Sequence, residues 1–145
     1  MAVEFISISG VLCEKVLQEQ AVFSAIRIVD VFGIPHDALP ATTAVQFEAL
    51  IYVRGFPSAE TFNVGFTVEG ASGERQEVPR PPGNPFRFDV FEGDPTIPVG
   101  LGIIVNLTIG ASKIGTNYLD VEVDGILRLR LPFTLRRIPA PPPVQ

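Results

Sequence analysis

Hydrophobic and polar residues alternate along most of this chain. The clearest case is residues 61–69, where Phe62, Val64, Phe66 and Val68 are separated by single polar or glycine positions. Because successive side chains of a β-strand point to opposite faces, this pattern predicts a half-buried strand. Its phenylalanine and valine side chains are expected to point into a core.

The same alternation recurs in segments separated by glycine, proline, asparagine and aspartate. The predicted strands cover residues 3–13, 21–32, 45–53, 61–69, 75–78, 86–90, 102–110, 116–123 and 127–135. About nine mostly antiparallel strands are typical of an all-β, two-sheet β-sandwich of the immunoglobulin-like or jelly-roll-like type. Residues 17–20 break the alternation and favour a turn, although residues 14–20 could instead form a brief helical turn. Pro132 interrupts the last strand, so we expect a free edge or a bulge there.

The last two predicted strands are joined by an Asp-Gly dipeptide at 124–125, which would ordinarily form a two-residue turn. Such a turn would set the charged Glu122 opposite the apolar Leu127 on one face. Adding the preceding valine to the loop would instead set Asp120 opposite Arg128. We therefore predict a three-residue turn with a glycine bulge.

Three carboxylates, on Asp120, Glu122 and Asp124, recur at every second residue and would share one face with Arg128 and Arg130. Paired carboxylates can perform general acid–base chemistry, but alternating charges on facing strands are more typical of a solvated surface. We interpret them as an exposed cross-strand ion-pair ladder, contributing about 0.2–1 kcal/mol per pair.

The chain of 145 residues has the usual size of a single domain. We expect residues 1–137 to form one β-sandwich domain. Residues 138–145 are rich in proline, which cannot donate to a sheet, and are expected to form an extended tail.

Composition narrows the possible partners. Hydrophobic residues make up 46% of the chain and charged residues only 19%, so we expect some apolar surface to be covered by a protein partner or by another copy of the chain. A net charge of −5 argues against nucleic acid and anionic membranes as partners.

The longest apolar run, residues 99–105, is far shorter than the roughly 20 residues that span a bilayer. A single cysteine and no basic leader at the amino terminus are typical of a cytoplasmic protein.

Candidate chemistry is sparse. Cys13 and His36 are the only cysteine and histidine of the chain, and the alternation places Cys13 in a strand, where a thiol usually behaves as a small hydrophobic group. No phosphate-binding loop, nucleophile elbow or metalloprotease motif occurs. We therefore expect no catalytic residues and no cofactor.

Acidic loop residues give a candidate binding site. If the strands ran up and down in sequence order, alternate turns would meet at one end of the sandwich. His36, Asp37, Glu92, Asp94 and Asp124 would then form an acidic rim suited to a cation, a polar small molecule or a sugar. Non-sequential crossovers would scatter these loops, and isolated charged residues in loops are usually only solvated.

Outward-facing apolar side chains give a candidate interface. Leu50 and Tyr52 share a predicted face with Gln46 and Glu48, and Phe91 lies outward near the end of the segment 86–90. A second subunit or the rest of the same chain would have to cover these side chains, and the alternation does not distinguish the two.

Several segments carry a resemblance to known proteins. They are Val3-Glu4-Phe5, Cys13, residues 26–32 followed by Ile34-Pro35, residues 121–125 and Leu131-Pro132-Phe133. In this order they resemble a group of short, uncharacterised bacterial β-sandwich proteins of unknown function, over residues 3–137. The resemblance implies a bacterial or phage origin and supplies no catalytic residues. Together the observations favour a non-catalytic interaction or structural module over a ligand-binding domain, and favour either over an enzyme.

Overall fold

The computed structural model describes residues 3–20, 22–39, 43–110 and 114–144, and within them the chain forms nine strands and no helix. The strands are β1 (Phe5–Glu19), β2 (Val22–Ile28), β3 (Val31–Ile34), β4 (Ala44–Gly55), β5 (Val64–Glu69), β6 (Arg75–Glu77), β7 (Val99–Gly110), β8 (Gly115–Val123) and β9 (Ile126–Arg137). The predicted all-β class is confirmed. Ala21, at the start of one predicted strand, and the outermost residues 1–2 and 145 of the predicted domain and tail lie outside the described residues.

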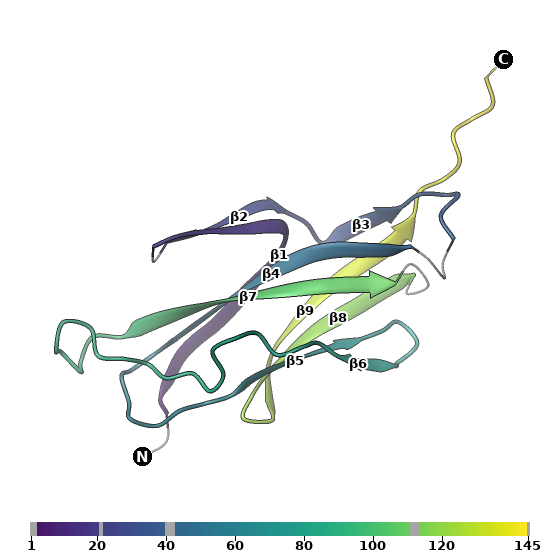
Figure 1. Cartoon of the computed structure of the whole chain (residues 1–145). Coiled ribbons are helices and arrows are strands. Elements are labelled where there is room, and N and C mark those ends of the chain that lie inside the picture. The colour runs from purple at the N-terminus through teal and green to yellow at the C-terminus, as the bar shows by residue number, and fades with distance from the viewer. Residues whose placement is uncertain (1–2, 21, 40–42, 111–113, 145) are drawn as a thin grey trace.

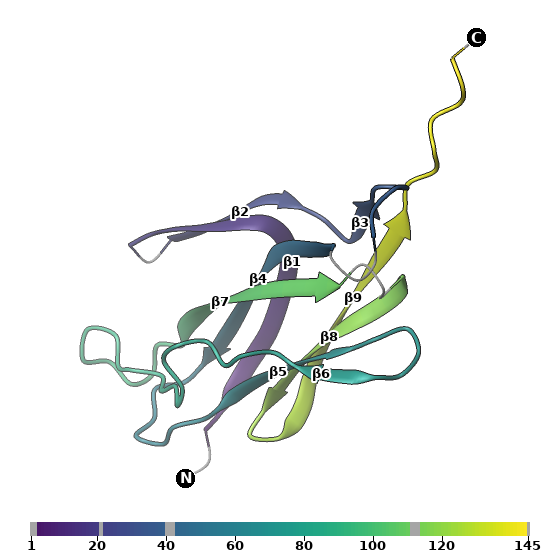
Figure 2. The ribbon, with the colours of Figure 1, turned by 45° about the vertical axis from the view of Figure 1, so that its right-hand side comes forward.

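Two sheets form the molecule (Figure 1). The four-stranded sheet has the order β2-β1-β4-β7, and the five-stranded sheet has the order β3-β9-β8-β5-β6. Every neighbouring pair is antiparallel except β3 and β9, which run parallel. Figure 2 shows β4 and β7 in one layer and β8 and β9 in the other. The predicted two-sheet sandwich is therefore confirmed.

The core lies between the two layers. Phe62, Val64, Phe66 and Val68 are all buried, as their alternation predicts. Facing them from the four-stranded sheet are the buried side chains of Phe47, Ala49, Ile51, Val53, Ile103, Val105, Leu107 and Ile109. Every second residue of β4, β5 and β7 thus enters the same apolar layer, because the pleat alternates side chains between faces.

Phenylalanines fill both ends of this layer. At one end the ring of Phe5 meets the edges of Phe62 and Phe88, with ring centroids 5.0 and 5.7 Å apart. At the other end, Phe32, Phe47 and Phe133 pack together. Edge-to-face and offset contacts of this kind add to the stabilisation from burial alone.

Three predicted segments differ from the observed strands. Residues 86–90 form only an isolated bridge between Phe62 and Phe86, and Val90 is exposed. The predicted strand 21–32 is divided at residues 29–30 into β2 and β3, which belong to different sheets. The expected turn at 17–20 is also wrong, because β1 pairs with β2 as far as Glu19. The predicted number of strands holds because one strand is lost and another is divided.

The turn between β8 and β9 contains two residues, Asp124 with φ 50° and Gly125 with φ 80°. The prediction of a three-residue turn is therefore wrong. The mismatch of faces is corrected inside β9, where Arg128 is left over as a bulge and the register shifts. Beyond the bulge Asp120 pairs with Arg130, so charged residues still face charged residues. Leu127, which lies between the turn and the bulge, is exposed rather than in the core.

Pro132 lies where β9 is paired on one side only. It faces Tyr118 of β8, whereas β3 pairs with β9 only from Thr134 onward. The missing N–H of proline therefore costs no ladder hydrogen bond at this free edge, as predicted.

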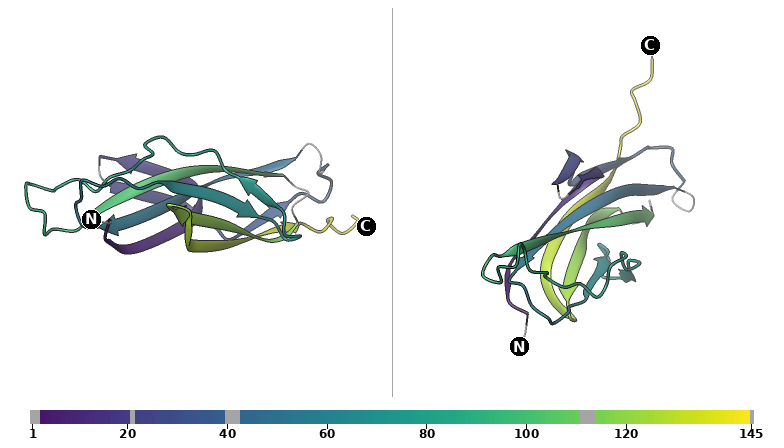
Figure 3. Two further views of the ribbon diagram at one scale, coloured as in Figure 1. Left: turned by 90° about the horizontal axis from the view of Figure 1, so that it is seen from below. Right: turned by 60° about the vertical axis from the view of Figure 1, so that its left-hand side comes forward.

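The carboxyl-terminal tail leaves the sandwich after Ile138, whose N–H donates to the carbonyl of Ile34 over 2.7 Å. Residues 139–144 are exposed and form no strand, and both views of Figure 3 show them extending away from the two sheets. Across the described ranges, no helix is long and apolar enough to cross a membrane.

Candidate interaction surface

The hairpin formed by β1 and β2 is the part of the four-stranded sheet with the most exposed apolar surface. Valine, isoleucine and phenylalanine supply four of the seven residues of β2, and such residues favour strands. The hairpin turns at Gln20, whose φ is 55° and whose carbonyl accepts a hydrogen bond from the Gln18 side chain over 3.1 Å. From there β2 runs back antiparallel along β1.

The register of the hairpin places three exposed apolar side chains on one face. Directly paired residues share a face, and the pairs are Lys15 with Ile26, Leu17 with Ser24, and Glu19 with Val22. These six residues are here called the hairpin outer face. Its apolar members are 48% exposed at Leu17, 65% at Val22 and 40% at Ile26. Ile28, at the end of β2, is 68% exposed.

The opposite face of the hairpin packs against its own chain. The ring of Phe23 lies over Gly102 of β7, where a Cβ atom would be only 2.3 Å from Phe23 Cζ. Because β2 and β7 are not neighbours in the sheet, this contact requires the hairpin to fold back over the outer surface of the sheet. Figures 1 and 2 show the bend in β1 that brings β2 to this position.

A buried carboxylate holds the hairpin in place. Oε1 of Glu48, on β4, accepts a hydrogen bond from the backbone N–H of Val16 over 3.0 Å and lies 3.3 Å from Nζ of Lys15. The thiol of Cys13 donates to the backbone carbonyl of Glu48, with a separation of 3.7 Å. The hairpin outer face is therefore presented on a fixed support, which lowers the entropic cost of binding a partner.

The environment of Cys13 does not favour nucleophilic chemistry. Its side chain is fully buried. Burial is the largest cause of the raised pKa of the thiol, and the negative charge of the nearby Glu48 carboxylate is the second. His36 is exposed in the loop after β3. A reactive cysteine normally needs an accessible thiolate, so this thiol has the character of a small core side chain.

β2 also has a free backbone edge. It is the outermost strand of its sheet and pairs only with β1 among the strands of the described ranges. Arg27 is its only charged residue, and the strand contains no proline. Edge strands are usually protected by charges, prolines or bulges, because unpaired N–H and C=O groups attract further strands. Here Arg27, with φ 54°, interrupts the edge near its end and leaves residues 22–26 open.

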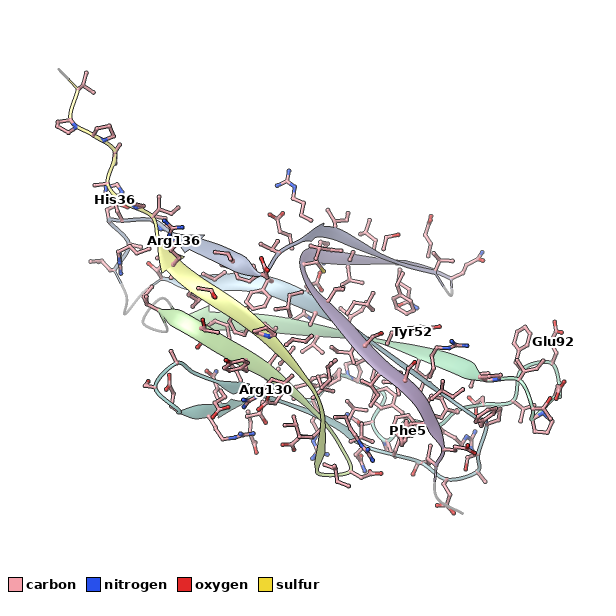
Figure 4. The ribbon with its side chains drawn as sticks, turned by 180° about the vertical axis from the view of Figure 1, so that it is seen from behind. Phe5, His36, Tyr52, Glu92, Arg130 and Arg136 are labelled. Carbon is pink, nitrogen blue, oxygen red and sulfur yellow. The ribbon has the colours of Figure 1, made fainter. Side chains whose placement is uncertain are left out.

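The interface residues predicted from sequence come from β4 and from the connection between β6 and β7. Leu50 is half-buried, while Tyr52 is exposed and has its hydroxyl over Gly100. Phe91 is exposed in the long connection between β6 and β7, and Figure 4 shows its neighbour Glu92 at the tip of a loop beyond Tyr52. Whether a partner covers any of these residues stays a prediction.

The predicted acidic rim is not assembled. His36 and Glu92 lie at opposite ends of the molecule in Figure 4. The non-sequential strand order explains why, because the loops do not alternate between two ends as they would in an up-and-down arrangement. Among the described residues no group of three or more histidine, cysteine, aspartate or glutamate side chains is placed to hold a metal ion.

The individual rim residues have local roles instead. Asp124 accepts a hydrogen bond from the N–H of Asn63 over 2.9 Å, which ties the β8–β9 turn to the start of β5. Asp94 accepts from both the N–H and the hydroxyl of Thr96, and the hydroxyl bond is the larger cause of its lowered pKa. The backbone carbonyl of His36 accepts from Arg137, and Asp37 is exposed beside it.

The predicted ion-pair ladder is a compact cluster rather than an exposed row. Asp120 is 1% exposed, and Arg130 contacts its carboxylate through Nε at 2.8 Å and Nη2 at 3.2 Å. Arg130 also pairs with Glu69 and lies 4.4 Å above the ring of Tyr118, while Arg75 approaches Asp120 from β6. Figure 4 shows Arg130 over the five-stranded sheet. The cluster covers the sheet face without opening a ligand site.

Sequence reasoning missed the hairpin outer face because β2 is apolar on both faces. Val22 and Ile26 alternate with Phe23 and Ala25, so periodicity alone does not reveal which set faces outward. The useful signal was the near absence of charge, because a strand with one charged residue in seven and apolar residues on both faces is unusual at an exposed sheet edge.

The comparisons add no family to this picture. No family model matches the chain, and no curated protein is significantly similar to it. The resemblance to short bacterial β-sandwich proteins therefore stays a prediction.

Proposed function

We propose that this protein is a non-catalytic interaction module that binds another protein chain at the hairpin outer face and the free edge of β2. The single observation that carries the proposal is the exposure of Leu17, Val22 and Ile26 on one face of an edge hairpin. A contiguous apolar surface beside unpaired backbone groups is the arrangement by which sheets accept an added strand.

Two further features support an interaction function. The hairpin is held by Glu48 and by the contact of Phe23 with Gly102, so a partner would meet a surface that is already ordered. The alternative of a cation, sugar or polar-ligand site on the acidic rim loses its support, because His36 and Glu92 lie at opposite ends of the sandwich.

The proposal is tested by affinity purification with the wild-type chain and two surface variants as bait. Untagged copies of the chain are also present, so that binding of a second copy would be detected. Ile26→Asp places a charge on the hairpin outer face, and Phe91→Asp makes the same change at an exposed apolar residue elsewhere. We expect the wild-type chain and Phe91→Asp to retain the same bound protein, whether a different protein or a further copy, and Ile26→Asp to lose it. Equal retention by Ile26→Asp, or loss only with Phe91→Asp, would overturn the proposal.

A further inference from the structure

We propose that the partner at the free edge of β2 is a second copy of this chain, paired antiparallel through residues 22–26 about a two-fold axis at Ser24. This inference rests on the proposed function and names its partner. The two four-stranded sheets would then join into one continuous sheet through their β2 strands.

The faces of β2 restrict the possible registers. Val22, Ser24 and Ile26 share the hairpin outer face, whereas Phe23 and Ala25 point toward the chain's own sheet. Two antiparallel copies keep their outer faces on the same side only if outer-face residues pair with outer-face residues. Registers displaced by one residue would set Phe23 beside exposed positions and are excluded.

Arg27 selects among the registers that remain. Its left-handed backbone, with φ 54°, interrupts the extended edge, and the ladder with β1 passes from Ile26 to Ile28 without it. The open edge is therefore residues 22–26, and its midpoint is Ser24. A pairing centred on Ser24 uses the whole open segment of both copies and leaves Arg27 outside the joined strands.

This register also matches apolar and charged groups across the junction. Val22 of one copy faces Ile26 of the other, and the two Ser24 side chains meet on the axis. In each copy, β1 adds the next side chain of the same cross-strand row. Glu19 lies beside Val22 in one copy, and Lys15 lies beside Ile26 in the other. Each apolar pair is therefore flanked by one negative and one positive residue, and no like charges face each other.

Two-fold symmetry closes the assembly at two copies. Each chain offers one β2 edge, and an isologous pairing consumes both edges, so growth stops at the dimer. A parallel arrangement would lack the two-fold axis and would not set Val22 against Ile26 on both sides. The chemistry of the edge thus favours a closed dimer over an open fibre.

The axis position provides a direct test. In Ser24→Glu and in Ser24→Lys, two like charges would meet at the axis, and each variant alone is expected to dimerise roughly tenfold more weakly than the wild-type chain. A one-to-one mixture would bring unlike charges together and restore a mixed dimer. Light scattering from about 1 μM to about 1 mM, with native mass spectrometry to identify the mixed species, measures both effects.

Matched substitutions Ser9→Glu and Ser9→Lys, at an exposed serine of β1 outside the hairpin, are expected to leave the dimer unchanged. Circular dichroism establishes that all four variants keep their strands. A wild-type chain that remains a monomer throughout this range overturns the second-copy inference. If Ile26→Asp still loses a different bound protein in the purification, the interaction function itself stands. A dimer that both Ser24 variants leave intact, or that the mixture fails to restore, overturns the register.

Discussion

Asp120 is a carboxylate on the outer surface of a sheet that is nevertheless almost completely buried. Its burial follows from the bulge at Arg128, which brings Arg130 rather than the apolar Leu129 opposite it. The guanidinium of Arg130 then contacts both oxygens of the carboxylate, and Nη1 of Arg75 lies 3.6 Å from Oδ2. The strand pattern predicts that Asp120 pairs with an arginine of the next strand. It does not reveal the bulge that makes this ion pair bidentate and buried.

We expect Asp120→Asn to lower the free energy of unfolding at neutral pH by about 1–3 kcal/mol, because charge-assisted hydrogen bonds to a buried group are lost. The measurement is urea unfolding followed by circular dichroism. Asp89→Asn is the matched control, since Asp89 pairs with Arg87 in an exposed ion pair at 2.9 Å and should change stability by less than about 0.5 kcal/mol. Equal effects of the two substitutions would contradict the role assigned to burial.

Cys13 leads to a prediction about reactivity and pH. A buried thiol with a raised pKa should react slowly with a thiol reagent in the folded protein and fully after unfolding in guanidinium. Ser9→Cys, at an exposed position of the same strand, should react rapidly under the same conditions. Fast labelling of Cys13 in the folded wild-type chain would show that the thiol is accessible.

The same raised pKa links Cys13 to stability. Because the folded-state pKa lies above the ordinary value of 9.0, the folded chain retains the thiol proton more strongly than the unfolded chain. The stabilisation is complete below pH 9 and declines as the pH rises through the folded-state pKa. Cys13→Ala should therefore lose stability less steeply above pH 9 than the wild-type chain, even if its stability at neutral pH is lower.

At the scale of elements, the last residue of β4 shows how closely the strands and connections pack. A Cβ atom on Gly55 would lie 2.3 Å from the ring of Phe88 and 2.7 Å from the carbonyl oxygen of Glu4. Phe88 is buried and the Glu4 oxygen belongs to the backbone, so neither can move aside freely.

We expect Gly55→Ala to lower the free energy of unfolding by about 1–3 kcal/mol through overpacking. Gly65→Ala, in β5, is the control, because no atom lies within 4 Å of the added Cβ. That substitution should be neutral or slightly stabilising, since glycine in a strand carries an entropic cost. Urea unfolding of both variants measures the difference, and a neutral Gly55→Ala would mean that the β4 end is less tightly packed than described.

Most elements could be predicted from sequence because their alternation is one-sided. In β5 and the two residues before it the apolar set is unambiguous, and all four predicted core residues are buried. In β2 both sets are apolar, so the sequence could not identify the exposed one. At the β8–β9 hairpin the conflict between charged and apolar faces was visible, but local periodicity could not decide whether the extra residue lies in the turn or at Arg128.

At the scale of the whole molecule, strand number and layer count could be predicted, but strand order could not. The acidic rim depended on an up-and-down order, whereas β4 pairs with β1 and β7, and β9 pairs with β3. Such pairings join segments far apart in the chain, and alternation within a segment carries no information about its distant neighbour. The hairpin outer face could not be predicted for the same reason, since the position of β2 at a sheet edge is a property of the complete topology.

The parallel pairing of β3 with β9 has a consequence for the order in which the protein folds during synthesis. Val31 meets Thr134, so β3 finds its neighbouring strand only after β4 to β9 have all been synthesised. Until then β3 has no strand beside it, while β1 and β2 can already join as a local hairpin. The five-stranded layer is thus completed only after β9 has been made, and a chain released before β9 would leave the edge of β8 open to improper association.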